Sequence, residues 1–387
     1  MPSHFFKFIP ALGFIIFTLL FTLNLTGCGS KVSHSDNTVV EEPPSEQITP
    51  KTIPTNHENN VKTPEALDNT HITIDANNTA SNLTDATTEK VTVPESQEPT
   101  SVIPFKTAKQ QALEVEKVKR FCDEIANKLR TVKYDGCMKL GLQTTDHYNS
   151  VQGRNLTYRH FTPNTNDDKT PAGKILFISG IHGDEYSAIS ITYLWMLNML
   201  EHQKENQQHW LFLPLTNPDG LFRNPATRIN ANNVDLNRNF PSPDWDELAI
   251  NYWVNHYRKN KRRYPGPSAN SEPETQWLVD IIDEFKPDAI ISVHAPYGLV
   301  DYDGPDHAVP NKIGALKHRE LGTFPGSLGR YAGEYLEIPV LTLELRAAGT
   351  MPSNKEIYNM WQDVEEWTST KVKGENPALP KSLTKSS

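Results

Sequence analysis

The sequence predicts an α/β fold in which a mainly parallel, mixed sheet is covered by helices on both faces, preceded by a disordered linker. Between residues 174 and 370, apolar runs of strand length alternate with segments of helical periodicity. The apolar runs are continuous, which is typical of strands buried on both faces. Residues 29–104 contain no Phe, Trp or Tyr. The folded part of the 387-residue chain is therefore expected to begin near residue 105.

The N-terminal segment has the features of a secretory signal. Residues 8–23 form an uncharged apolar run that follows Lys7. A membrane-spanning helix needs about 20 residues, so this run is short for one and fits the core of a signal peptide. The next residues, Leu25-Thr26-Gly27-Cys28, resemble the bacterial lipoprotein box, in which the cysteine is lipidated. We expect a signal peptide over residues 1–27 and a lipid on Cys28; the alternative is an uncleaved N-terminal anchor.

Both interpretations place the rest of the chain outside the cytoplasm. Gly29 stands where many lipoproteins retained at the inner membrane have Asp. We therefore expect a membrane-anchored lipoprotein that faces the periplasm, in the outer membrane of a Gram-negative bacterium. In that oxidising space, Cys122 and Cys137 are expected to form a disulfide.

Residues 28–104 are expected to be a disordered acidic linker rich in Thr, Pro and Asn. From residue 29 onward this segment has 4 Lys against 12 Asp and Glu, which is -8 of the formal net charge of -9. A segment without aromatic residues cannot bury enough apolar surface to offset the entropy of ordering. The remaining chain is close to neutral, so a nucleic-acid partner is not expected.

The folded part is expected to consist of a helical extension over residues 105–147 and a main domain over residues 148–372, followed by a disordered tail over residues 373–387. A helix is predicted over residues 108–129, where apolar residues recur every three or four positions. The main domain has predicted strands at 174–179, 210–215, 288–293 and 339–343, and predicted helices at 185–202, 272–285 and 354–370.

Polar side chains with metal-binding chemistry follow three of the predicted strands. His182 and Glu185 lie in the turn after the first strand, and His294 and Glu344 end two later strands. Ligands gather at the carboxyl ends of the strands in such folds. Two His and one Glu are a ligand set of catalytic zinc, which keeps a fourth position open to water.

Two further motifs connect these residues with a known family. Asn217-Pro218-Asp219-Gly220 is followed by Val234-Asp235-Leu236-Asn237-Arg238-Asn239-Phe240-Pro241. Together with H-x-x-E and the later His and Glu, they resemble the signature of the zinc metallocarboxypeptidases. The resemblance runs from about Tyr148 to Trp367 and implies the metallocarboxypeptidase, phosphorylase-like fold and a catalytic domain of a zinc metallopeptidase.

The resemblance implies a role for each matching residue. His182, Glu185 and His294 would hold one Zn²⁺ ion, and Glu344 would be the general base. Asp235 would orient His182. Asn237 and Arg238 would hold the terminal carboxylate of the substrate. Arg228 would stabilise the oxyanion of the transition state, with Arg223 as the alternative for that role.

Within the family, residues 271–276 and 325–329 are most similar to the murein peptide amidases, which cleave the γ-D-glutamyl–diaminopimelate bond of cell-wall peptides. We therefore expect a cell-envelope peptidase acting on peptidoglycan-derived peptides. Asp301, Asp303 and Asp306 are either turn residues or partners for the side-chain ammonium of diaminopimelate. A substrate-capping tyrosine cannot be chosen among Tyr297, Tyr302 and Tyr331.

Two other functions stay open at this point. One is a zinc hydrolase with another substrate, either a carboxypeptidase of other peptides or an amidohydrolase of acylated amino acids. The other is a non-catalytic wall-binding lipoprotein, although such a protein has no need of Glu344. The oligomeric state cannot be predicted.

Overall fold

The computed structural model describes residues 107–164 and 172–372. The chain divides into two units, Met1–Pro94 and Glu95–Ser387, and all of the described residues belong to the second. The expected signal peptide with Cys28, the linker over 28–104 and the tail over 373–387 lie outside the described residues. Among the helices that are described, none is both long enough and apolar enough to cross a membrane.

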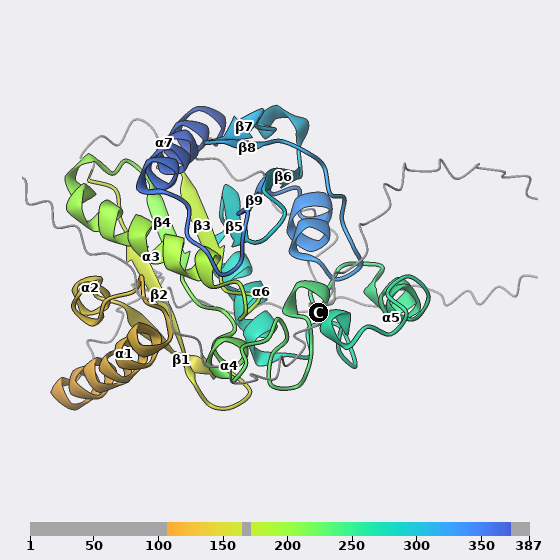
Figure 1. Ribbon diagram of the computed structural model, residues 1–387, viewed down its shortest axis with the longest axis horizontal. Coiled ribbons are helices and arrows are strands. Elements are labelled where there is room, and N and C mark those ends of the chain that lie inside the picture. Colours follow the sequence, from red (N-terminus) through yellow and green to blue (C-terminus); the bar gives the residue numbers. More distant parts are fainter. Residues whose placement is uncertain (1–106, 165–171, 373–387) are drawn as a thin grey trace, which may run out of the picture. The chain divides into compact units, whose positions relative to one another are not determined.

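The centre of the second unit is a seven-stranded sheet with the strand order β1-β2-β4-β3-β5-β9-β6 (Figure 1). The four central strands β4, β3, β5 and β9 are parallel, while β1, β2 and β6 are antiparallel to their neighbours. This confirms the predicted mainly parallel, mixed sheet. The strands are β1 (Gln143–Asn149), β2 (Asn155–Phe161), β3 (Lys174–Ser179), β4 (His209–Leu213), β5 (Ala289–His294), β6 (Leu299–Asp303) and β9 (Val340–Glu344); a separate hairpin pairs β7 (Lys312–Ile313) with β8 (Leu316–Lys317).

The sheet begins earlier than the sequence suggested. β1 starts at Gln143, inside the segment 105–147 that was expected to be helical. Its sequence, QTTDHYN, has no apolar run, and only one of its seven residues is buried. By contrast, all six residues of β5 are buried, because helices cover both of its faces. A polar strand near the sheet edge is held by its backbone pairing with β2 rather than by burial of its own side chains.

Capping residues determine where the first and last helices begin. α1 begins at Ala108 because the side chain of Thr107 accepts a hydrogen bond from the backbone N–H of Gln110, and α7 is capped by Ser353 in the same way. The predicted helices over 108–129, 185–202, 272–285 and 354–370 are confirmed within two residues at each end. The helices are α1 (Ala108–Lys128), α2 (Tyr134–Lys139), α3 (Tyr186–Glu201), α4 (Pro218–Phe222), α5 (Trp245–Asn255), α6 (Pro273–Phe285) and α7 (Asn354–Lys371). Shorter turns are η1 (Gln203–Glu205), η2 (Leu236–Arg238), η3 (Lys261–Arg263), η4 (Asp306–Ala308) and the π-helical η5 (Gly329–Tyr335).

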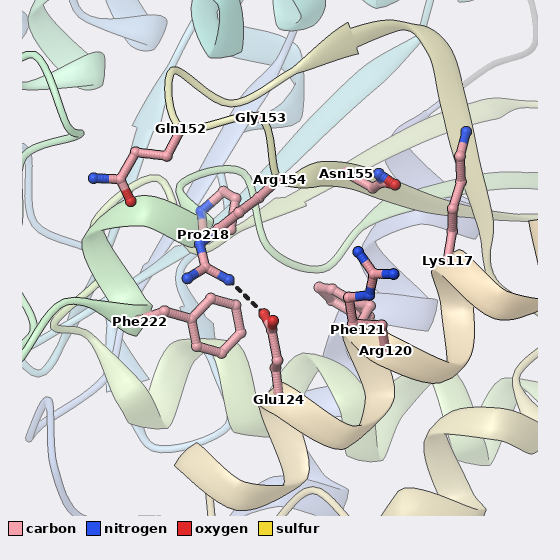
Figure 2. Close-up of a pocket in the computed structure, with 10 residues that line it drawn as sticks. All are labelled: Lys117, Arg120, Phe121, Glu124, Gln152, Gly153, Arg154, Asn155, Pro218 and Phe222. Atoms are coloured by element: carbon pink, nitrogen blue, oxygen red, sulfur yellow. Dashed lines mark hydrogen bonds and ion pairs between the residues drawn. The ribbon is translucent and has the colours of Figure 1, made fainter.

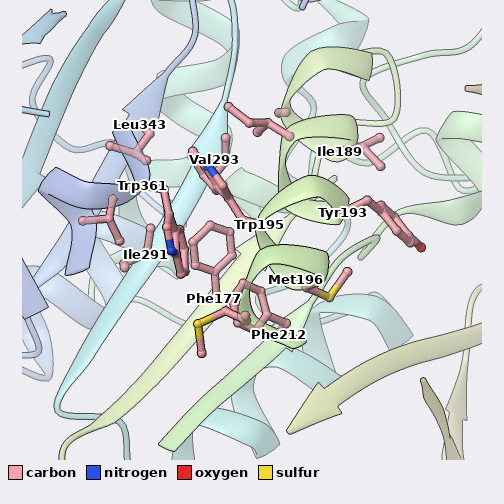
Figure 3. Packing of buried hydrophobic residues seen from close by; sticks show 14 of the residues in the cluster. Phe177, Ile189, Tyr193, Trp195, Met196, Phe212, Ile291, Val293, Leu343 and Trp361 are labelled. Atoms are coloured by element: carbon pink, nitrogen blue, oxygen red, sulfur yellow. The ribbon is translucent and has the colours of Figure 1, made fainter. Parts of the chain in front are cut away.

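Helices cover the two faces of the sheet with two separate apolar clusters. On one face, Phe177 of β3 packs with Trp195 of α3, and Trp195 packs with Trp361 of α7 (Figure 3). On the other face, Leu176 and Ile290 belong to a cluster formed with α6 and η5. Consecutive strand residues alternate between the clusters, as the pleat of a strand requires. The same alternation decides which face each residue at the strand ends can reach.

α1 is fastened to the segment that follows it. Cys122 of α1 and Cys137 of α2 form a disulfide with a Cα–Cα distance of 5.6 Å, which confirms the predicted pairing. Both cysteines are buried in the larger apolar cluster together with Ile125 and Leu129. The helical extension is therefore part of the core that supports the sheet.

Candidate metal centre and active site

The carboxyl ends of adjacent parallel strands bring the predicted site residues together. β5 lies between β3 and β9, and its last residue, His294, is paired in register with Glu344, the last residue of β9. The turn that leaves β3 carries His182 and Glu185. The four residues are all buried, with exposed fractions between 2% for His182 and 7% for Glu344. The arrangement expected from the strand-end positions is confirmed.

Close backbone packing shapes the turn between His182 and Glu185. A Cβ atom at Gly183 would lie 2.2 Å from the backbone of Gly220 in α4, so only glycine fits there. The side chain of Asn217 caps α4 and also donates to the carbonyl oxygens of Ile181 and Arg228. The Asn217–Gly220 motif therefore holds the turn through the hydrogen bond to Ile181 and the close packing against Gly183.

Three potential ligand side chains meet at one point. His182 Nδ1 lies 2.8 Å from Glu185 Oε1, and His294 Nδ1 lies 3.1 Å from Glu185 Oε2. The two Nδ1 atoms are 3.1 Å apart. Among the residues that the structure describes, this is the one group of three or more His, Cys, Asp or Glu side chains close enough to hold a metal ion.

The donor set fits zinc. When both imidazoles carry their proton on Nε2, two nitrogen lone pairs and a carboxylate face one another, an arrangement that a cation stabilises. In a tetrahedral zinc site with ligands about 2.1 Å from the ion, neighbouring ligand atoms are about 3.4 Å apart, close to the separations found here. His182, Glu185 and His294 are therefore suited to hold a zinc ion.

The outer nitrogens of both imidazoles have partners that fix the rings. His182 Nε2 lies 3.2 Å from Asp235 Oδ1, and His294 Nε2 lies 2.9 Å from the hydroxyl of Ser292. Metal-binding histidines commonly donate their second N–H to such groups, which sets the tautomer and ring orientation. The structure thus places Asp235 where the sequence predicted a positioning carboxylate. Ser292 was not predicted, although it lies two residues before His294 and so on the same face of β5.

Arg228 joins this cluster, whereas Arg223 does not. The Arg228 Nε donates to Asp235 Oδ2 at 2.8 Å, and its Nη1 lies 3.1 Å from His182 Nδ1 and 3.7 Å from Glu185 Oε1. Arg223 is exposed at the end of α4. Of the two arginines considered for the oxyanion, only Arg228 is near the candidate ligands.

The charges in the cluster act on one another at short range. Burial alone would raise the pKa of Glu185, but the imidazoles of His182 and His294 outweigh it and lower this pKa. Burial likewise opposes the charge on Asp235, yet Arg228 holds its pKa well below the usual range. For His182, burial and the nearby Arg228 lower the pKa. Neutral His182 and ionised Glu185 match the protonation states of metal ligands. Burial opposes the charge on His294, but Glu185 outweighs it and raises the His294 pKa, so a metal ion would have to displace a proton from this imidazole.

Glu344 differs from the other carboxylates of the cluster because no described residue forms an ion pair with it. Burial raises the pKa of Glu344 to about 7, although His294 opposes the shift. The backbone N–H of Tyr297 donates a long hydrogen bond of 3.5 Å to its Oε2. A carboxylate with a pKa near neutrality can both take up and release a proton, which suits a general base.

Asn237 and Arg238 lie on η2, at one side of the cluster. Asn237 Oδ1 accepts from the backbone N–H of Leu328 at 2.8 Å. The Arg238 guanidinium stacks 4.3 Å above the Phe324 ring, and its Nη2 donates to the Tyr257 hydroxyl at 3.0 Å. Arg238 Nε is buried and has no hydrogen-bond partner among the residues that the structure describes.

The three candidate capping tyrosines separate by exposure. Tyr302 and Tyr331 are buried at 7% and 9% exposure, and the Tyr302 hydroxyl donates to the carbonyl of Pro305. Tyr297 is 58% exposed and lies next to Glu344. Among these three, only Tyr297 presents its ring to solvent beside the candidate site.

The basic run over residues 259–263 contributes two arginines that were not predicted to lie near the site. Arg262 forms an ion pair of 2.8 Å with Asp184 in the ligand turn, and Arg263 Nη1 lies 3.9 Å from Asp235 Oδ2. Burial lowers the pKa of Arg263. A run of five residues with four positive charges resembles an exposed loop, so no signal in the sequence distinguished these arginines.

A separate cavity lies away from the metal centre. It has a volume of about 290 Å³ and is lined by α1, the turn between β1 and β2, and α4. Arg154 and Glu124 form an ion pair across it, and Phe222 lies beneath the Arg154 guanidinium (Figure 2). None of the candidate ligands or Glu344 lines this cavity. Its connection with the site is α4, which lines the cavity and also packs against the turn that carries His182 and Glu185.

A mixed α/β sheet with two His and one Glu at its strand ends is a zinc-binding arrangement, and comparison with known proteins gives the family. The family model of the zinc carboxypeptidases matches residues 143–303. Murein peptide amidase A of Vibrio campbellii is 31% identical over 179 residues, which cover 44% of this chain and 68% of that protein. The chain belongs to the zinc carboxypeptidase family.

Other similar proteins differ in how much of each chain the match covers. Murein peptide amidase A of Escherichia coli K12 is also 31% identical, over 169 residues that cover 43% of this chain and 59% of that protein. The crystal structure of murein-tripeptide amidase from Escherichia coli O157 has a TM-score of 0.40 at 22% identity, covering 58% of this chain and 91% of that one. Carboxypeptidase A from Helicoverpa armigera has a TM-score of 0.48 at 18% identity, covering 67% and 80%.

Proposed function

We propose that this protein is a zinc-dependent peptidase that hydrolyses the γ-D-glutamyl–diaminopimelate bond in peptidoglycan-derived peptides. The observation that carries the proposal is the register of β5 and β9, which places the buried Glu344 beside His294 of the His–Glu–His centre. The relatives named murein peptide amidase A support the choice of substrate.

The metal centre would consist of one ion held by His182, Glu185 and His294. A bound zinc ion supplies Lewis-acid polarisation of the scissile carbonyl and lowers the pKa of water. Asp235 and Ser292 hold the two imidazoles in place through their outer nitrogens.

The chain's own residues account for the proton transfers and the charge that develops. Glu344 takes a proton from the attacking water and delivers it to the leaving amine. Arg228 donates toward the oxygen that becomes negative in the transition state. The paired amide and guanidinium of Asn237 and Arg238 bind the carboxylate of the leaving residue. The unpartnered Nε of Arg238 supports this role, since a buried donor is costly without an acceptor.

The direct test is hydrolysis of the tripeptide L-Ala-γ-D-Glu-meso-diaminopimelate by the purified, zinc-loaded full chain. Mass spectrometry should detect free diaminopimelate, and a chelator should abolish its release until zinc is added back. A zinc-loaded protein that releases no diaminopimelate would overturn the proposed substrate. Release of C-terminal residues from ordinary peptides instead would favour a general carboxypeptidase.

We also propose that the enzyme is a lipoprotein, anchored through Cys28 and facing the periplasm, in the outer membrane of a Gram-negative bacterium. The lipoprotein-box resemblance of Leu25-Thr26-Gly27-Cys28 supports this location. The Cys122–Cys137 disulfide is consistent with an oxidising compartment. Labelling with a fatty-acid probe should modify the wild type but not Cys28→Ala, and membrane fractionation should identify the membrane. Equal labelling of both proteins would exclude the anchor.

A further inference from the structure

A second row of polar side chains lies next to the catalytic row on the same face of the sheet. The register pairs His294 with Glu344, and one step further into the sheet it pairs Ser292 with Thr342 and Thr342 with Asp301. Residues two apart on a strand point to the same face. Ser292, Thr342 and Asp301 therefore share the face of His294 and Glu344, and Asp301 is the diagonal neighbour of Glu344, at about 7–8 Å between backbones.

Asp301 is a buried carboxylate that forms no ion pair in the described part of the chain, although the charge of His318 acts on it. It is 5% exposed, and the backbone N–H of Leu321 donates to its Oδ1 at 3.0 Å. No basic side chain in the described part of the chain forms an ion pair with Asp301 or with Asp303, the next residue on this face. The Asp303 side chain is packed against Gly329 and Gly333 of η5, where a Cβ would meet it within 3 Å. Buried charges in proteins are normally paired, so the Asp301 carboxylate lacks the ion-pair partner expected of a buried charge.

One short segment connects Asp301 with the residues proposed to bind the substrate carboxylate. The backbone of Leu321 contacts Asp301, the ring of Phe324 lies beneath Arg238, and the backbone of Leu328 contacts Asn237. Residues 321–328 thus join the acidic position to the Asn237–Arg238 pair. A residue whose carboxylate is held by that pair would therefore lie beside the segment that contacts Asp301.

We propose that Asp301 determines specificity by binding the ammonium group at the end of the side chain of the leaving residue. This inference rests on the proposed function and extends it from the bond cleaved to the side chain selected. The class of ligand is an amino acid with a linear side chain that carries an ammonium group, as in diaminopimelate. Thr342 and Ser292 supply hydroxyl groups on the same face of the sheet, and Asp301 supplies a carboxylate that forms no ion pair with any described side chain.

The experiment compares three tripeptides that differ only in the third residue: meso-diaminopimelate, lysine and norleucine. Lysine keeps an ammonium group, and norleucine has none. The wild type should hydrolyse the diaminopimelate and lysine peptides at least about tenfold more efficiently, in kcat/KM, than the norleucine peptide. Asp301→Asn should lower kcat/KM about 30-fold or more for the two peptides with a side-chain ammonium group and leave the norleucine peptide unaffected.

Asp306→Asn is the matched control, because it removes the same charge at an exposed position five residues away. It should leave all three rates unchanged. Zinc content and thermal midpoint establish that Asp301→Asn is folded, and the wild-type preference tests the inference even if this variant does not fold. Equal losses on all three peptides, or no wild-type preference for an ammonium group, would overturn the role of Asp301 alone. Failure of the wild type to cleave any of the three would overturn the proposed function as well.

Discussion

Replacing Glu344 by Gln is the sharpest test of the proposed mechanism. The change removes the ability to accept a proton and keeps the size and shape of the side chain. Glu344 makes no ion pair among the described residues. Its carboxylate accepts a hydrogen bond of 3.5 Å from the backbone N–H of Tyr297, and the amide oxygen of Gln could accept the same bond. The substitution should therefore leave folding and zinc binding unchanged.

The expected loss of rate follows from the absence of a substitute base. The other buried carboxylates of the cluster, Glu185 and Asp235, are occupied by His182, His294 and Arg228. General-base catalysis contributes about 10²–10⁴-fold. Since each tenfold change is about 1.4 kcal/mol, the barrier should rise by about 3–5 kcal/mol, mostly in kcat.

The assay measures release of diaminopimelate from the tripeptide by wild type, Glu344→Gln and the control Glu366→Gln, which changes an exposed glutamate of α7. Zinc content is measured on the same samples. The reasoning is refuted if fully zinc-loaded Glu344→Gln keeps more than about a tenth of the wild-type kcat, since a base contributes at least about 10²-fold.

Three further predictions concern zinc affinity and the stability of the fold. Asp235→Asn should weaken zinc affinity about 10–100-fold, measured by competition with a chelating dye, because it removes the carboxylate partner of His182 and of Arg228; unchanged affinity would contradict the positioning role. Changing Cys122 and Cys137 together to Ala should lower the free energy of unfolding by about 3 kcal/mol, measured in urea, since the disulfide closes a loop of 15 residues; a change below about 1 kcal/mol would mean that the unfolded chain is not constrained by this link. Burial raises the pKa of Glu274 from 4.5 to about 7, so the folded state binds its proton more tightly than the unfolded state. The free energy of unfolding should therefore fall by about 2–3 kcal/mol between pH 5 and pH 8, measured by urea unfolding at each pH. The fall should be smaller in Glu274→Gln, and identical stability curves against pH for the two proteins would exclude Glu274 as its source.

The central part of the fold could be predicted from the sequence because its strands are buried on both faces. β3 was predicted at its observed bounds, and β9 within one residue, since both consist of uninterrupted apolar runs. β1, β2 and β6 were not predicted. Their sequences, QTTDHYN, NLTYRHF and LVDYD, mix polar and apolar residues, and they join the sheet by pairing of β1 with β2, β2 with β4 and β6 with β9. The partners β4 and β9 lie distant in the chain from β2 and β6.

The candidate site likewise contains residues whose proximity could be predicted from the sequence and residues whose proximity could not. His182, Glu185, His294 and Glu344 follow strands, and the carboxyl ends of parallel strands must meet, so their proximity could be predicted. The approach of Arg263 to Asp235 could not, because it depends on how residues 256–270 fold back onto the cluster. Asp301 was one of three ambiguous acids until the strand register placed it on the face of Glu344.

The pairing of His294 with Glu344 also determines which parts of this enzyme can vary. Backbone hydrogen bonds between β5 and β9 fix the distance between ligand and base, beginning at Ile290 and Val340. A slip of one residue would turn Glu344 to the opposite face and abolish the centre. The segment between β6 and β9 also packs on this ladder, since η5 shares an apolar cluster with Ile290 and Val340. Leu321 and Leu328 of the same segment contact Asp301 and Asn237. Changes in this segment can therefore alter the surroundings of the proposed substrate site without changing the backbone pairing that joins ligand and base.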